Sequence, residues 1–154
     1  MAKIGVLGAG TWGMALARML SNSGHEVTVW SALPQEVDEL SRTRRQKNLP
    51  GMVIPDEIKF TKEIAEACQD KDIILFAVPS VFVRSTAKTA AAFIPDGQII
   101  VDVAKGIEPD TLLTLTEVIA DELNKEAREL IKAARIPHTT RPFTPAGSNL
   151  ATNV

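Results

Sequence analysis

The stretch Gly8-Ala9-Gly10-Thr11-Trp12-Gly13 follows the apolar run Lys3-Ile4-Gly5-Val6-Leu7 and precedes a run with helical spacing that begins at Met14. A G-x-G-x-x-G turn between a strand and a helix is typical of sites that bind the pyrophosphate of a dinucleotide. The first glycine permits the tight turn, the second lets the backbone approach the phosphates, and the third lets the helix pack closely on the strand. Amide groups and the positive end of the helix then face the phosphates. The cofactor contacts predicted here are Gly8, Gly10, Thr11, Trp12 and Gly13; the alternative is a structural glycine turn in an unrelated α/β domain.

Length and composition limit the classes of protein that this chain can belong to. It has 154 residues, of which 45% are hydrophobic, which is enough for one domain with a core. The net charge of -2 gives no electrostatic reason to expect nucleic acid or an anionic membrane as a partner. One cysteine and two histidines provide neither a disulfide nor a structural zinc site. Because no secretory leader and no apolar run of about 20 residues is present, we expect a cytoplasmic protein without a membrane partner.

Segments typical of strands alternate with segments typical of helices through the first 130 residues or so. The run Ile73-Ile74-Leu75-Phe76-Ala77-Val78 is continuously apolar, which favours a central strand covered on both faces. The patterns predict strands at 3–7, 26–30, 58–61, 73–78 and 98–103, and helices at 12–23, 34–43, 62–68, 81–93 and 111–131.

This alternation predicts an α/β fold with a doubly wound, Rossmann-like parallel sheet, whose ligand crevice lies at the carboxyl ends of the strands. We expect a dinucleotide-binding domain over residues 1–134. Residues 135–154 have no regular period and contain Pro137, Pro142 and Pro145. They are therefore expected to form an irregular tail without a sixth strand.

The end of the second strand bears on the choice between NAD and NADP. An NAD-selective site commonly has an acidic residue about 20 positions after the glycines, but this chain has Trp30-Ser31-Ala32 there. NADP is therefore possible, and Arg42, Arg44 and Arg45 supply positive charge if the following loop folds back. An arginine-rich stretch after a helix is also typical of a solvated surface, so NAD or NADP stays open.

Two further strand ends carry candidate residues. Val78-Pro79-Ser80 either stops a strand before a helix or lies against the nicotinamide side of the cofactor. In Ala104-Lys105-Gly106, the ammonium of Lys105 points at the crevice and suits a phosphate or a polarised oxygen, unless Lys105 is an ordinary surface lysine. We expect Asp102 to pair locally or to line the top of the sheet, His25 to face solvent and Cys68 to fill space in a helix.

Four motifs together resemble one family. They are Gly8-Ala9-Gly10-Thr11-Trp12-Gly13, Leu49-Pro50-Gly51, Val78-Pro79-Ser80 and Ala104-Lys105-Gly106-Ile107-Glu108. Over about residues 1–130 the chain resembles the N-terminal domain of bacterial NAD(P)-dependent glycerol-3-phosphate dehydrogenase. The resemblance implies that Thr11 and Trp12 contact the cofactor, that Ser31 and Ala32 flank its adenosine ribose, and that Lys105 touches cofactor and substrate phosphate. It also implies hydride transfer between sn-glycerol 3-phosphate and dihydroxyacetone phosphate, which feeds phospholipid biosynthesis.

Two departures from the family pattern restrict what the resemblance implies. Many members carry a basic residue or a histidine where this chain has Ser31-Ala32. The family continues with a sixth strand, a Ser-Gly-Pro turn and a helical C-terminal domain with a catalytic lysine, which residues 135–154 do not match. We therefore expect a truncated or frame-shifted product or an excised cofactor domain, with no catalytic residue and no metal site of its own. Its uncovered sheet edge and apolar helix faces favour self-association.

Two alternative functions belong to different classes. One is a stand-alone nucleotide-binding or redox-sensing module without catalysis, which the unmatched end favours. The other is a different dehydrogenase with the same N-terminal architecture, such as a ketopantoate reductase or a hydroxyacyl-CoA dehydrogenase. The matches at Trp12 and Lys105-Gly106 argue against the second alternative.

Overall fold

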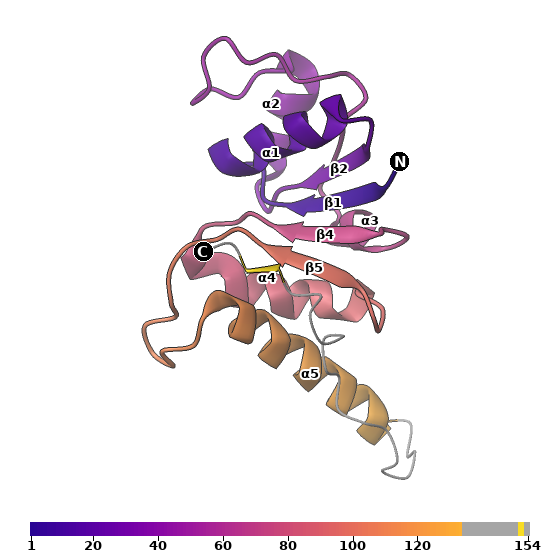
Figure 1. Ribbon diagram of the computed structural model, residues 1–154, viewed down its shortest axis with the longest axis vertical. Coiled ribbons are helices and arrows are strands. Elements are labelled where there is room, and N and C mark those ends of the chain that lie inside the picture. The colour runs from indigo at the N-terminus through magenta and orange to yellow at the C-terminus, as the bar shows by residue number, and fades with distance from the viewer. Residues whose placement is uncertain (134–150, 153–154) are drawn as a thin grey trace.

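A parallel sheet with the strand order β3-β2-β1-β4-β5-β6 lies at the centre of the molecule (Figure 1). The computed structural model describes residues 1–133 and 151–152. The strand order changes direction between β1 and β4, so a crevice opens at the carboxyl ends of these two strands. The strands are β1 (Lys3–Leu7), β2 (Glu26–Trp30), β3 (Lys59–Thr61), β4 (Ile73–Phe76), β5 (Ile99–Asp102) and β6 (Ala151–Thr152).

Helices cover both faces of this sheet (Figure 1). Residues of α1 and α2 pack on one face in one hydrophobic cluster, and residues of α3, α4 and α5 pack on the other face in a second cluster. The helices are α1 (Thr11–Asn22), α2 (Pro34–Thr43), α3 (Ile64–Cys68), α4 (Val83–Ala90) and α5 (Leu115–Ala133), with 3₁₀ turns at Ser80–Phe82 and Ala91–Phe93. The predicted doubly wound α/β fold is confirmed.

Side chains of β4 alternate between the two faces, as its continuously apolar sequence predicts. Ile74 and Phe76 are fully buried against α3, α4 and α5, whereas Leu75 is buried on the α1 side. β4 pairs with β1 on one edge and with β5 on the other. It is therefore a central strand with no face or edge open to water.

α5 begins four residues later than predicted, at Leu115 and not at Thr111. Thr114 and Glu117 form a capping box: Glu117 Oε2 accepts a hydrogen bond of 2.8 Å from the Thr114 N–H, and Thr114 Oγ1 accepts one of 3.3 Å from the Glu117 N–H. Leu112 adopts a left-handed conformation with φ of 59°, which is incompatible with a continuing helix. The Thr-x-x-Glu spacing was the signal for this helix start.

The remaining differences at element ends are smaller. The helix predicted at 81–93 consists of α4 with a 3₁₀ turn at each end, and the strand predicted at 73–78 ends at Phe76. Within residues 1–133 and 151–152, none of the helices is long and apolar enough to cross a membrane.

The prediction that no strand follows residue 134 is wrong. β6 pairs in parallel with β5, with Ala151 opposite Val101 and Thr152 opposite Asp102. An edge strand presents unpaired N–H and C=O groups that any short extended segment can satisfy. A strand of two residues is too short to show a period in the sequence, which is why pattern analysis missed it.

Candidate functional site

The glycine turn after β1 has a different steric reason for glycine at each of its three positions. Gly8 has φ of +122°, and a Cβ there would lie 2.7 Å from the Ala77 carbonyl carbon of the neighbouring strand end. A Cβ on Gly13 would overlap the Gly8 carbonyl oxygen, because α1 packs directly on the turn. A Cβ on Gly10 would meet no atom within 4 Å, so the space above Gly10 is open. This is the geometry expected where a backbone receives a pyrophosphate.

α1 directs its N-terminal end at this open space. The helix starts at Thr11, and its first internal hydrogen bond runs from the Met14 N–H to the Gly10 carbonyl, at 2.9 Å. Thr11 and Trp12 are exposed beside this start, Trp12 by 57%. The partial positive charge of the helix end favours an anion above Gly10.

A first cavity, here called the Lys105 cavity, opens at the carboxyl ends of β1, β4 and β5. It has a volume of about 530 Å³. Its lining comes from three strand ends and is formed by Gly10, Thr11, Trp12, Ala77, Val78, Pro79, Ser80, Val103, Ala104 and Lys105. Lys105 is the one titratable side chain in this lining, and it is exposed. The topology thus brings together Thr11, Trp12, Pro79 and Lys105, which the sequence analysis selected from separate motifs.

A second cavity, here called the Ser31 cavity, lies on the other side of the glycine turn and has a volume of about 480 Å³. It shares Gly10, Val78 and Pro79 with the Lys105 cavity, so the two cavities adjoin at the turn and are together called the groove. Its further lining residues are Gly8, Ala9, Trp30, Ser31, Ala32, Leu33, Glu36, Phe82, Ser85, Thr86 and Thr89. In this lining the one charged side chain is Glu36.

Glu36 was missed by the sequence analysis, which looked for an acidic residue at the strand end itself. The Ser31 hydroxyl donates a hydrogen bond of 2.5 Å to Glu36 Oε2 and accepts one of 3.2 Å from the Leu33 N–H. Ser31 is buried by these contacts. A serine that precedes a helix starting at Pro34, with an acid in the first helical turn, was the available signal.

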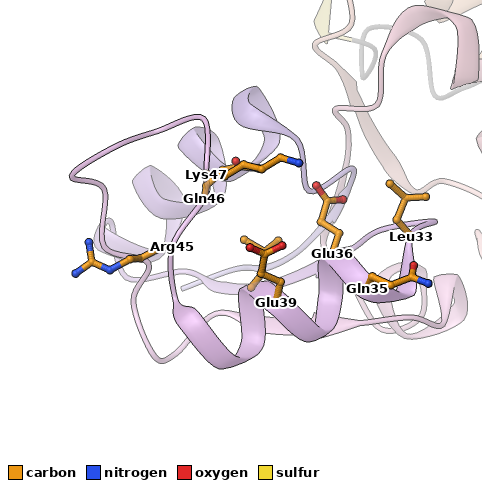
Figure 2. Close-up of a pocket in the computed structure, with 8 residues that line it drawn as sticks. Leu33, Gln35, Glu36, Glu39, Arg45, Gln46 and Lys47 are labelled. Atoms are coloured by element: carbon orange, nitrogen blue, oxygen red, sulfur yellow. The ribbon is translucent and has the colours of Figure 1, made fainter.

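A third pocket, here called the Lys47 pocket, continues the groove beyond Glu36 (Figure 2). It has a volume of about 220 Å³ and shares Leu33 and Glu36 with the Ser31 cavity. Figure 2 shows Lys47 extending toward Glu36, while the guanidinium of Arg45 points away from it. Its lining is formed by Leu33, Gln35, Glu36, Glu39, Leu40, Arg45, Gln46 and Lys47.

The three arginines that could have supplied positive charge to the cofactor, Arg42, Arg44 and Arg45, do not act together. Arg44 donates hydrogen bonds to the carbonyls of Ile58, at 2.8 Å, and Pro55, at 3.4 Å, and lies over the Phe60 ring. It therefore holds the loop after α2, and does not face the groove. Arg45 lines the Lys47 pocket, and Arg42 lines none of the cavities described above.

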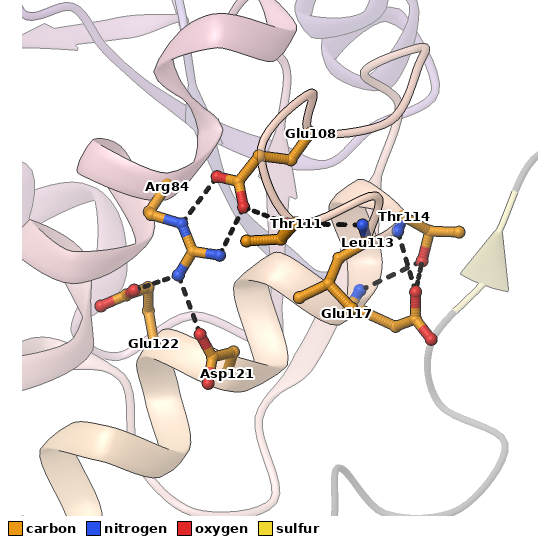
Figure 3. A network of polar contacts seen from close by, with 8 residues as sticks. All are labelled: Arg84, Glu108, Thr111, Leu113, Thr114, Glu117, Asp121 and Glu122. Carbon is orange, nitrogen blue, oxygen red and sulfur yellow. Dashed lines mark hydrogen bonds and ion pairs between the residues drawn. The ribbon is translucent and has the colours of Figure 1, made fainter.

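Arg84 fixes the loop that carries Lys105 (Figure 3). Its Nε and Nη2 atoms donate to the two carboxylate oxygens of Glu108, each at 2.6 Å, and Nη1 bonds Asp121 at 2.8 Å and also Glu122. The hydrogen bonds that Arg84 donates lower the pKa of Glu108 to about 2, and the carboxylates that accept them, that of Glu108 above all, raise the pKa of Arg84. This network ties the loop after β5 to α4 and α5.

Asp102 fixes the start of the same loop. Its carboxylate accepts a hydrogen bond of 2.9 Å from the Ala104 N–H and another from Thr116, which confirms the predicted local pairing. Burial raises its pKa. Asp102 is thus a structural anchor next to Lys105.

The other titratable candidates lie outside the groove. Cys68 is buried, and burial raises the pKa of its thiol to about 12, so it is a poor nucleophile. His25 Nδ1 accepts a hydrogen bond of 3.2 Å from the Ala2 N–H, which ties the N-terminus to the loop before β2. In the part of the chain that the structure describes, no group of three or more His, Cys, Asp or Glu side chains is arranged to hold a metal ion.

Comparison with known proteins identifies the family. The model of the N-terminus of NAD-dependent glycerol-3-phosphate dehydrogenase matches residues 3–133. The chain belongs to this family. It is 97% identical over 128 residues to glycerol-3-phosphate dehydrogenase [NAD(P)+] 2 of Lactobacillus delbrueckii subsp. bulgaricus, an alignment that covers 83% of this chain and 38% of that protein.

Two further family members are similar over different lengths. The glycerol-3-phosphate dehydrogenase of Enterococcus faecalis is 37% identical over 158 residues, which cover 97% of this chain and 46% of that protein, further along the chain than the family model reaches. The crystal structure of the Coxiella burnetii glycerol-3-phosphate dehydrogenase superposes with a TM-score of 0.74 at 30% identity, over 79% of this chain and 38% of that one. The chain thus spans less than half the length of these relatives.

Proposed function

We propose that this chain is the NAD(P)-binding part of an sn-glycerol-3-phosphate dehydrogenase that acts in the cytoplasm. The observation that carries the proposal is the pair of adjoining cavities on the two sides of the glycine turn, at the point where the strand order reverses. An elongated dinucleotide needs such a groove, with the backbone free of side chains at its middle. The names of the relatives supply the reaction, and they name NAD or NADP as the cofactor.

Each part of the groove suits one part of the cofactor. The pyrophosphate fits the open space above Gly10, at the positive end of α1. The adenosine fits the Ser31 cavity beside Ala32, and the nicotinamide fits the Lys105 cavity against Pro79. When bound, the nicotinamide ring donates or accepts a hydride.

Lys105 is proposed to bind phosphate on the cofactor and on the substrate. Among the side chains that the structure describes, none forms an ion pair or a hydrogen bond with its ammonium. Its loop is fixed from both sides, by Asp102 and by the Arg84–Glu108 pair. An unpaired lysine on a fixed loop is suited to bind an incoming dianion such as glycerol 3-phosphate or dihydroxyacetone phosphate.

The Lys105 cavity does not supply a complete catalytic site from its described lining. Oxidation of the substrate carbinol needs a base for the hydroxyl proton, but the lining holds the hydroxyls of Thr11 and Ser80 and no carboxylate or imidazole. Its one titratable side chain, Lys105, is poorly placed to take that proton if it holds the phosphate. We infer that residues 1–134 form a cofactor-binding domain with negligible turnover of their own. The lack of a suitable base in the described lining also favours the alternative function, a stand-alone nucleotide-binding module without catalysis.

Titration of the 154-residue chain with NADH and NADPH, followed by calorimetry and by the intrinsic fluorescence of Trp12 and Trp30, tests the proposal. We expect saturable one-to-one binding of at least one dinucleotide, with competition by ADP-ribose. Binding of neither nucleotide would contradict the proposal. Oxidation of NADH that depends on dihydroxyacetone phosphate would contradict the inferred lack of turnover and would reject the binding-only module.

A further inference from the structure

We propose that Glu36 is a specificity-determining residue that makes the groove selective for NAD(H) over NADP(H). This inference rests on the proposed function, because it concerns the adenosine end of the same groove. The carboxylate that selects the ribose comes from the first turn of α2 and not from the end of β2. Ser31, at the end of β2, holds it in place.

The register of the sheet brings this carboxylate close to the glycine turn. Leu7 pairs with Trp30, and the Gly8 N–H donates a hydrogen bond of 2.9 Å to the Trp30 carbonyl, so Ser31 lies beside the turn that takes the pyrophosphate. The hydrogen bond of 2.5 Å from Ser31 Oγ then draws Glu36 back toward the end of β2. Glu36 therefore lies at the level of the adenosine ribose, even though it is distant from the glycines in sequence.

The hydrogen bonds of the carboxylate leave one oxygen available. Oε2 accepts from Ser31, whereas Oε1 of Glu36 has no hydrogen bond to a residue in the described part of the chain. A free carboxylate oxygen accepts hydrogen bonds from the ribose hydroxyls of NAD(H). The same oxygen repels a 2′-phosphate, which has no proton to donate at neutral pH and carries charge of the same sign.

The lining of the Ser31 cavity supplies no positive charge to offset this repulsion. Glu36 is the one charged residue of that lining. Arg45 and Lys47 line the neighbouring Lys47 pocket, from which Lys47 extends toward Glu36 (Figure 2). Arg44 is engaged with Pro55 and Ile58. Within the lining of the Ser31 cavity, the carboxylate of Glu36 is therefore the one charge that a ribose or a 2′-phosphate would meet.

The test compares NADH with NADPH on the full chain and on two matched variants. E36Q keeps an oxygen that accepts from Ser31 but removes the charge. E39Q is the control, because Glu39 lies in the Lys47 pocket and does not line the Ser31 cavity. We expect the unaltered chain to bind NADH about tenfold more tightly than NADPH, which is a typical effect of one unfavourable charge contact.

E36Q is expected to reduce this ratio about tenfold, mainly through tighter binding of NADPH, whereas E39Q leaves it within about twofold. Higher ionic strength should lower the preference of the unaltered chain for NADH over NADPH, because that preference depends on the charge of Glu36. The preference of E36Q should not change with ionic strength. Equal or tighter binding of NADPH by the unaltered chain, or equal ratios for E36Q and E39Q, would overturn the inference.

A second measurement separates this inference from the proposed function. Competition by adenosine 5′-monophosphate and by adenosine 2′,5′-bisphosphate probes the adenosine end alone, and it needs only the unaltered chain if E36Q fails to fold. We expect the monophosphate to bind more tightly, and the opposite order would overturn the selectivity. If neither dinucleotide binds, the proposed function fails and the selectivity fails with it; if both bind with equal affinity, only the selectivity fails.

Discussion

Gly10 and Gly13 belong to one motif, but the structure gives them different roles. The position of Gly10 is open, and its φ of −65° is accessible to any residue. The position of Gly13 is closed by the backbone of Gly8, which no side-chain movement can relieve. Substitution therefore separates ligand binding from folding within the same turn.

We expect G10A to keep the fold and lose the ligand. The change should alter the free energy of unfolding by less than about 1 kcal/mol, because the new methyl group meets only open space. It should weaken NADH binding at least tenfold, because the methyl group occupies the place of the pyrophosphate. G13A is the contrasting variant, destabilised by about 1–3 kcal/mol or more through overpacking. Thermal melts with NADH titrations check both, and unchanged NADH affinity in G10A would contradict the assignment of this turn.

Glu36 shows the limit of motif spacing at the scale of one residue. Spacing along the chain led to Ser31 and Ala32, and both line the predicted cavity. The charge that dominates this cavity comes from a residue five positions later, which a side-chain hydrogen bond draws into the site. Such a contact depends on the angle at which α2 leaves β2, and no local pattern encodes that angle.

At the level of secondary-structure elements, the start of α5 depends on the capping box of Thr114 and Glu117. Replacing Thr114 with Ala removes the acceptor for the Glu117 N–H and leaves that group unsatisfied. We expect T114A to lower the free energy of unfolding by about 1 kcal/mol. Urea denaturation measures this, with S41A as the control because the Ser41 hydroxyl is exposed on α2 and caps no helix. An equal loss in both variants would show that the cap does not define the start of α5.

The loop between β5 and α5 should lose stability in acid. Glu108 has a pKa of about 2 in the folded chain, against 4.5 ordinarily, so its ionised form stabilises the fold. Because the folded pKa is the lower one, this stabilisation is fully present above about pH 4.5 and is lost as the pH falls toward 2. We expect the melting temperature to fall more steeply between pH 5 and pH 3 in the unaltered chain than in E108Q.

The control for this pH dependence is E57Q, which removes an exposed carboxylate on the loop before β3. Between pH 5 and pH 3, the melting temperature of E57Q should fall with pH as steeply as that of the unaltered chain. Parallel slopes for E108Q and the unaltered chain would contradict the role of the Arg84–Glu108 pair. Differential scanning fluorimetry at half-unit pH steps is sufficient to distinguish these outcomes.

At the scale of the whole molecule, large apolar side chains are exposed in the segments that follow two strands. Val81 is 76% exposed and Leu112 is 71% exposed, in the segments that follow β4 and β5. Such exposure favours association with another surface. The sequence also predicted an uncovered sheet edge as a second cause of self-association. This cause is weaker than expected, because β6 pairs with the end of β5. We therefore propose that self-association occurs through the exposed apolar side chains of the segments that follow β4 and β5.

We expect the chain to associate reversibly at high concentration in sedimentation velocity experiments. The double variant V81S/L112S should weaken this association about tenfold, because it removes apolar area from the contact. V53S is the control, since Val53 is also exposed but lies on the loop after α2. A monodisperse monomer at high concentration, or an equal effect of V53S, would contradict the proposal.

Sequence and tertiary structure contributed different parts of this description. The order and type of the elements through residue 133, the parallel sheet and the steric need for glycine after β1 follow from the sequence, because hydrophobic period and glycine sterics act over a few residues. The pairing of β6 with β5, the separation of Arg44 from Arg45 and the return of Glu36 to the end of β2 were decided only by the tertiary structure. These contacts join groups whose distance in space is set by strand register and helix packing, and not by their spacing along the chain.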